Sequence, residues 1–200
     1  MYKPYLRHRR SSKIAGWFAL VGVCLLSGCA SIMGSVTGGL ASNLSAAILN
    51  SDDPAMIRDG APSYLILIDS LVAGSPDNAA LLAQSAELHS AYAGAFVEDP
   101  VRAARLNSKA KAQILRATCR SLKNACGLES RDFDEFSAWV DAQGPSSVPA
   151  LYNLGSIWAG WIQGNSSDFA AIAQLGRVKA LIQRVADLDP EHANGGAFLY

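Results

Sequence analysis

The sequence predicts an all-α protein in which antiparallel helical hairpins stack side by side. Half of the 200 residues are hydrophobic and alanine is abundant, whereas runs rich in Val, Ile and Thr are few. That composition favours packed helices over sheets. Apolar residues recur at helical spacing, and short turn signals separate the periodic segments.

The N-terminal region has the three parts of an export signal. Its basic start contains no acid, and the apolar run 14–26 is 13 residues long. A membrane-spanning helix needs about 20 residues, so a cleaved signal peptide is favoured over a permanent transmembrane anchor. The basic residues are Lys3, Arg7, Arg9, Arg10 and Lys13.

The segment Leu26-Ser-Gly-Cys29 resembles the lipobox of bacterial lipoproteins. It predicts removal of residues 1–28 as a lipoprotein signal peptide and lipidation of Cys29 with acyl chains such as palmitate. Each buried methylene adds about 0.8 kcal/mol of membrane affinity. The alternative is an ordinary secretory signal with a chance cysteine. Ala30 is not the Asp that retains lipoproteins, so the resemblance implies the outer membrane and its periplasmic face.

Cleavage changes the charge balance. The whole chain has 17 basic and 17 acidic residues, and five basic residues leave with the signal. The mature chain of 172 residues therefore carries 12 basic against 17 acidic residues, a net charge of −5. This balance argues against a nucleic-acid partner and against a second, polybasic membrane contact.

The mature chain is expected to begin with a tether at 29–50 and to continue as one helical domain at 51–200. The tether is small and polar, with Gly34, Gly38 and Gly39, and ends in a short helix at 40–49. The length of the remainder suffices for one domain with its own core.

Turn signals divide the domain into helices. Asp53-Pro54 starts the first helix, which passes Gly60 and Pro62 and continues to residue 73. Its part at 64–73 is apolar nearly all round, so we expect it to be buried among neighbours, with a strand as the alternative. The further helices are expected at 79–97, 101–122, 132–139, 148–163 and 169–188.

The last hairpin resembles a degenerate tetratricopeptide repeat. Leu154-Gly155-x-x-Trp158 precedes a second helix that closes with Asp187-Leu-Asp-Pro190. Ser75-Pro-Asp-Asn78 ends an earlier hairpin in a similar way. Helix pairs of this kind stack into a curved array with a concave surface.

Two cysteines remain available for a disulfide after Cys24 leaves and Cys29 is acylated. On one continuous helix, Cys119 and Cys126 would lie about 10 Å apart along the axis, too far for a bridge. Asn124 or Gly127 offers a helix stop, so a disulfide would join a helix end to its loop. A metal pair is the competing interpretation, but no His or further Cys lies near in the sequence.

No catalytic motif is present, so we expect no enzyme, no cofactor and no metal site. His8 leaves with the signal, and His89 and His192 stand alone, as packed or surface histidines usually do. The acidic cluster at 132–135 lacks the glycine and trailing glutamate of a calcium-binding loop and instead indicates a helix start.

Aromatic residues next to glycines give a candidate ligand path. Wide rings beside bare backbone leave room for an apolar ligand or a partner's loop, although core packing is the simpler interpretation. The candidate residues are Tyr92, Phe96, Tyr152, Trp158 and Trp161.

Several linked segments resemble the TatT component family, the periplasmic lipoproteins associated with tripartite ATP-independent periplasmic (TRAP) transporters. They cover nearly the whole mature chain. The segments are Arg58-Asp-Gly-Ala-Pro-Ser-Tyr-Leu-Ile-Leu67, Pro76-Asp-Asn78, Ser90-Ala-Tyr-Ala-Gly-Ala-Phe-Val-Glu-Asp99, Val148-Pro-Ala-Leu-Tyr-Asn-Leu-Gly155 and Trp158-Ala-Gly-Trp-Ile162.

The resemblance implies a repeat-like helical fold that assembles as a homotrimer, docks a periplasmic solute-binding protein and passes a small hydrophobic ligand through internal pores. Family chains usually continue with another hairpin after a segment like Asn194–Tyr200, so the chain is expected to be a truncated copy. The alternative function is a helical-repeat scaffold for envelope protein assembly, with no ligand.

Overall fold

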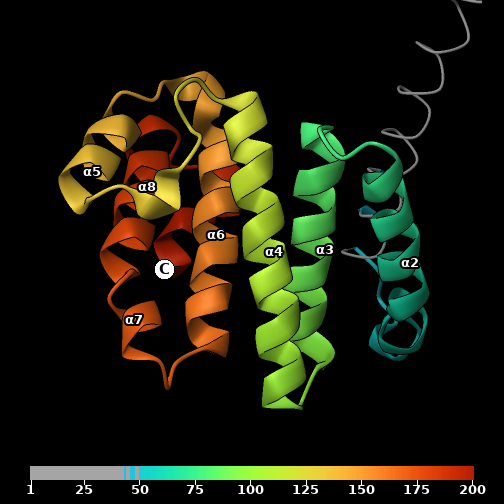
Figure 1. Cartoon of the computed structure of the whole chain (residues 1–200). Coiled ribbons are helices and arrows are strands. Elements are labelled where there is room, and N and C mark those ends of the chain that lie inside the picture. The colour runs from blue at the N-terminus through green and yellow to red at the C-terminus, as the bar shows by residue number, and fades with distance from the viewer. Residues whose placement is uncertain (1–42, 44–45, 48–49) are drawn as a thin grey trace, which may run out of the picture. The chain divides into compact units, whose positions relative to one another are not determined.

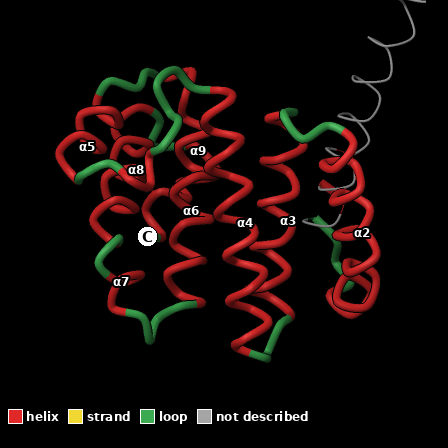
Figure 2. The backbone as a smooth tube through the Cα atoms, in the orientation of Figure 1, coloured by secondary structure: helices red, strands yellow, loops and turns green. Residues whose placement is uncertain are grey.

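The computed structural model describes residues 43, 46–47 and 50–200, and this part of the chain consists of helices and turns without a strand (Figure 2). The predicted all-α class is therefore confirmed, and the strand alternative for 64–73 is wrong. The lipobox with Cys29, the glycine-rich tether and most of the short helix expected at 40–49 lie outside the described residues.

Five long helices form a row in chain order, each packed on the one before it (Figure 1). Each long helix runs antiparallel to the one before it (Figure 1). As a result α3 and α6 run in the same direction, on either side of α4, and also contact each other. The helices are α2 (Pro54–Gly74), α3 (Ala79–Phe96), α4 (Pro100–Ser121), α6 (Val148–Gly164) and α8 (Leu175–Leu188).

Shorter elements complete the α8 end of the row. Helix α5 packs on α8, and α7 leads from α6 into α8. The short helices are α5 (Phe133–Asp141), α7 (Phe169–Ile172) and α9 (His192–Gly195), and the 3₁₀ turns are Leu128–Ser130, Pro145–Ser147 and Gly196–Leu199.

Side-chain caps mark the starts of α2, α3, α4, α5 and α7. Pro54 occupies the first position of α2, as the Asp53-Pro54 signal predicted, and Pro100 occupies the same position in α4. A capping oxygen accepts a hydrogen bond from an otherwise unpaired backbone N–H and typically contributes about 1 kcal/mol. The capping residues are Asp53, Asn78, Asp99, Asp132 and Asp168.

Two expectations need correction. The helix expected at 169–188 is split, because the chain makes a tight turn at Ala173 and Gln174 between α7 and α8. The apolar part of α2 is buried on one face only: Ile66 is 72% exposed and Leu67 43% exposed. Helix α2 is the first of the row and packs mainly on α3, and its outer face has no neighbouring helix among the described residues.

The core lies between the long helices and continues under α5. Trp158 and Phe136 are its largest fully buried side chains. Burying one large apolar side chain contributes roughly 1.5–3 kcal/mol, so this core supplies most of the favourable energy of folding. Other fully buried members are Leu82, Leu151, Leu154, Leu181 and Val185.

Candidate functional site

An apolar cavity lies between α2 and α3. Its volume is about 220 Å³, and Tyr92 and Phe96 line it together with Leu65 and Leu88. The rings of Tyr92 and Phe96 are 5.8 Å apart. These two members of the candidate ligand path therefore share one pocket, and its wall is mostly apolar.

A larger cavity of about 690 Å³ lies between α3, α4 and α6, and Tyr152 lines it. Two glycines of α6 allow the helices to approach closely here. A Cβ at Gly164 would lie 2.8 Å from the Asn107 side-chain nitrogen, and one at Gly160 would lie 3.0 Å from Ser90 Oγ. Ser90 and Asn107 therefore form a polar floor directly beside bare backbone.

The other two aromatic candidates do not line either cavity. Trp158 is fully buried, packs edge-on to Phe136 with ring centroids 5.9 Å apart, and donates to Gln174 Oε1 at 2.8 Å. Trp161 donates from Nε1 to Ser108 Oγ at 3.2 Å. The five predicted aromatic residues are thus distributed over three places in the row rather than along one continuous path.

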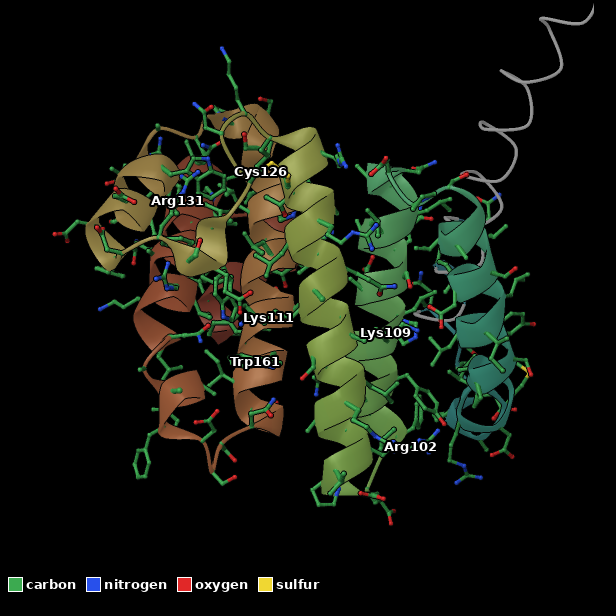
Figure 3. The ribbon with its side chains drawn as sticks, in the orientation of Figure 1. Arg102, Lys109, Lys111, Cys126, Arg131 and Trp161 are labelled. Atoms are coloured by element: carbon green, nitrogen blue, oxygen red, sulfur yellow. A yellow bond between two sulfur atoms is a disulfide. The ribbon has the colours of Figure 1, made fainter. Side chains whose placement is uncertain are left out.

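The buried ammonium group of Lys111 lies against both tryptophans. Its Nζ is 3.6 Å from the Trp161 ring centroid and 4.8 Å from that of Trp158 (Figure 3). It donates to Glu129 Oε1 at 2.6 Å and to Gln174 Oε1 at 3.1 Å. Burial lowers the pKa of Lys111, and the bond to Glu129 opposes that shift.

Sequence reasoning missed this cluster. The available signal was the position of Lys111 on α4, where it shares the core-facing stripe of Asn107, Ala110, Ile114 and Thr118. A lysine at such a position must either bury its ammonium group or extend its alkyl stem until the ammonium group reaches water. Here the ammonium group is buried, and hydrogen-bond partners and aromatic rings stabilise its charge.

A second polar cluster joins α2, α3 and α4 around His89. Its Nδ1 lies 2.7 Å from the Ser85 carbonyl oxygen and therefore carries a proton, since a carbonyl oxygen only accepts. Its Nε2 faces Asp69 Oδ2 at 3.5 Å, and Lys109 donates to the same Asp69 oxygen. Burial is the largest cause that lowers the pKa of His89, ahead of the opposing hydrogen bond to Ser85. The expected packed histidine is thus held in a network of its own.

The remaining histidine and the acidic cluster have simple surroundings. His192 packs edge-on to Tyr152 with ring centroids 5.2 Å apart. Asp132 caps α5 by accepting from the Glu135 backbone N–H at 2.8 Å. Within the part of the chain that the structure describes, no group of His, Cys, Asp or Glu side chains is arranged to hold a metal ion.

The structure joins the sulfur atoms of Cys119 and Cys126 across the end of α4. The helix ends at Ser121, and positive φ angles at Asn124 and Gly127 turn the chain back, so the two Cα atoms lie 4.4 Å apart. We predict that both cysteines of the purified protein resist alkylation until a reductant is added, which peptide mass spectrometry measures. Alkylation of either one without reductant would contradict the bridge.

The fold defines an all-helical hairpin protein with cavities between its helices. Among residues 50–200, no helix combines the length and hydrophobicity that a membrane crossing requires. The TRAP transporter T-component family matches residues 50–200, and the chain belongs to this family. The predicted family resemblance and a role as a TRAP transporter component are thereby confirmed. Comparisons with curated proteins and with solved structures find no match.

Proposed function

We propose that the chain is a lipoprotein of the outer membrane that faces the periplasm, docks the solute-binding protein of a TRAP transporter and helps to pass it a small hydrophobic ligand. The family match over residues 50–200 carries this proposal. The anchor is the set of acyl chains on Cys29, and the working assembly is a homotrimer of tetratricopeptide-like arrays. No catalytic step is part of the proposal.

The apolar cavity supports the hydrophobic ligand. At about 220 Å³ it is smaller than the roughly 300–1,000 Å³ of drug-sized pockets, so it suits a short alkyl chain or a single ring. Tyr92 and Phe96 supply flat walls, and Ala95 lines the cavity with a minimal side chain.

The outer face of α2 supports docking. Contiguous exposed apolar surface usually marks an interaction site, because it stays unfavourably hydrated until a partner covers it. The exposed apolar residues of this face are Met56, Tyr64, Ile66 and Leu67.

The docking test is a crosslinked pull-down of the full-length protein from its native membranes, with bound proteins identified by mass spectrometry. We expect the wild-type protein to capture a periplasmic solute-binding protein. Ile66→Lys should reduce the amount captured at least tenfold. Ala138→Lys, on the exposed side of α5, should leave that amount unchanged. Capture of envelope-assembly machinery without a solute-binding protein would replace the proposal with the scaffold function.

The ligand test is native mass spectrometry of gently purified protein. We expect a retained hydrophobic small molecule in the wild type. Ala95→Leu narrows the apolar cavity and should reduce its occupancy severalfold, whereas Ala80→Leu, exposed on the same helix and outside the cavity, should not. Equal occupancy in all three proteins would place the ligand elsewhere.

A further inference from the structure

The larger cavity differs from the apolar one by a charged residue in its wall. Glu87 is the one charged side chain that lines it within the described part of the chain, and hydroxyl and amide groups share the rest of the wall with alanine and glycine residues. Its volume of about 690 Å³ lies in the range of small-molecule sites. A half-buried acid without a lining cation gives this space a negative potential.

The carboxylate of Glu87 forms no hydrogen bond or ion pair with any described residue. Burial raises its pKa above the usual 4.5, because water solvates the charged form less well in the cavity. A half-buried carboxylate of this kind gains most from a ligand that brings a positive charge and N–H donors.

A second polar atom, in the wall of the cavity, also lacks a partner. Ser156 Oγ is buried and makes no hydrogen bond within the described residues. Ser90 and Gly160 nearly touch where the parallel helices α3 and α6 meet, and Glu87 and Ser156 each lie about one turn before that contact. The carboxylate and the free hydroxyl therefore occupy the same level of the cavity.

Aromatic rings stand at this same end. Tyr152 lies one turn before Ser156 on α6 and lines the cavity with Tyr200, their centroids 6.4 Å apart. Tyrosine faces attract cations, with about 0.5–1 kcal/mol at exposed sites. A carboxylate, a free hydroxyl and aromatic rings together make up the usual recognition set for an amine.

We propose that the cavity between α3, α4 and α6 binds a small organic cation, whose ammonium group pairs with Glu87 and whose remaining polar atoms reach Ser156 and the Ser90–Asn107 floor. The glycines at 160 and 164 let α6 pack close to this floor, because a side chain at either would collide with Asn107 or Ser90.

This site is separate from the apolar cavity. Ala91 is the one described residue that lines both, so the two spaces lie on opposite sides of α3. Any part that the bound cation plays in uptake rests on the proposed function, whereas the binding itself does not. A purified protein that binds an amine but captures no solute-binding protein would sink only the proposed function.

The test compares two probes of equal length and shape by isothermal titration calorimetry of the purified protein at pH 7.5. The probes are 4-aminobutan-1-ol, which is a cation, and butane-1,4-diol, which is its neutral counterpart. We expect the amine to bind at least tenfold more tightly than the diol. Glu87→Gln should remove this preference, and Glu135→Gln, an exposed acid on α5, should keep it.

A pH series on the wild type tests the same proposal without any variant. Amine binding should weaken by up to tenfold per pH unit once the pH falls below the raised pKa of Glu87, since a protonated carboxyl cannot pair with an ammonium group. The other titratable side chains that line the cavity are the phenols of Tyr152 and Tyr200. Equal binding of amine and diol, no amine binding, or an amine affinity that Glu87→Gln leaves intact would overturn the proposal.

Discussion

Lys109 and Lys111 lie two residues apart on α4 and face opposite sides of the row (Figure 3). Residues two positions apart on an α-helix point in directions about 200° apart, so these two lysines meet two different environments. The Lys111 side chain is 4% exposed and is enclosed by Trp158, Trp161 and Glu129. The Lys109 side chain is 40% exposed and pairs with a partly exposed Asp69.

The difference shows how the two sides of the row are held. On the α6 side, aromatic rings exclude water around the charge and join α4 to the turn before α8. On the α2 side, an acid, a lysine and His89 form a polar network that water still reaches, and Asp69 Oδ1 is buried without a hydrogen-bond partner among the described residues. The free energy of unfolding should therefore depend more strongly on the α4–α6–α8 side.

Truncating Trp158 should have the largest effect. Trp158→Ala removes a fully buried ring and the bond to Gln174, and should lower the free energy of unfolding by about 3–5 kcal/mol in urea denaturation. Trp158→Phe retains most of the ring volume and should cost clearly less. A Trp158→Ala protein of wild-type stability would mean that Trp158 lines a functional space rather than the core.

The two lysines themselves give the direct comparison. Lys111→Ala loses a buried alkyl stem and the contacts with two indole rings, which should cost about 2–3 kcal/mol. Lys109→Ala should cost less than about 1 kcal/mol, because a partly exposed ion pair contributes little. Urea denaturation of both variants measures the difference, and equal losses would show that the two sides are held alike.

Glycine-to-alanine substitutions compare the packing of the backbone on the two sides of the row. A Cβ at Gly155 would lie 2.8 Å from Ile182 Cδ1 on α8, so Gly155→Ala should destabilise by about 1–2 kcal/mol through overpacking. A Cβ at Gly60 inside α2 would meet no heavy atom of the described neighbours within 4 Å, so Gly60→Ala should stabilise by about 0.5–1 kcal/mol through helix propensity. Thermal unfolding should shift in opposite directions, and a shift of the same sign would contradict the close α6–α8 packing.

Helix starts were predictable from the sequence because the signals are local. Asp53, Asn78 and Asp99 cap their helices through atoms within three residues. The break between α7 and α8 was not predictable in the same way. Gln174 accepts from both Trp158 and Lys111, and these two partners come from other helices.

The candidate site was predictable only in part for the same reason. The sequence marked Tyr92 and Phe96, which share a cavity one turn apart on α3, and it marked glycines beside aromatic residues on α6. The sequence did not predict Glu87 as a cavity residue, because only the packing of α3 against α6 brings Glu87 and Ser156 into the wall of the same cavity. Distances along one helix can be read from sequence, but contacts between helices depend on the whole row.

The stability of the α2 side should also depend on pH. Burial lowers the pKa of His89 below its usual 6.5, so the folded chain takes up that proton less readily than the unfolded chain. As the pH falls below 6.5, proton uptake stabilises the unfolded state relative to the folded state. The free energy of unfolding should therefore fall by at most about 1.4 kcal/mol per pH unit. About one pH unit above 6.5 the imidazole is largely neutral in both states, and the slope becomes small.

The measurement is urea denaturation of the wild type and of His89→Gln between pH 7.5 and 5.5. The groups that face the imidazole are Asp69 on α2, Lys109 on α4 and the Ser85 carbonyl on its own helix. The raised pKa of Glu87 acts in the opposite direction, since its protonation favours the folded state, but it is present in both proteins and cancels in their difference. We expect the wild type to lose more stability on acidification than His89→Gln. Parallel pH profiles would mean that Asp69 offsets the burial of His89, and that the α2 side tolerates a charged histidine as readily as it tolerates Lys109.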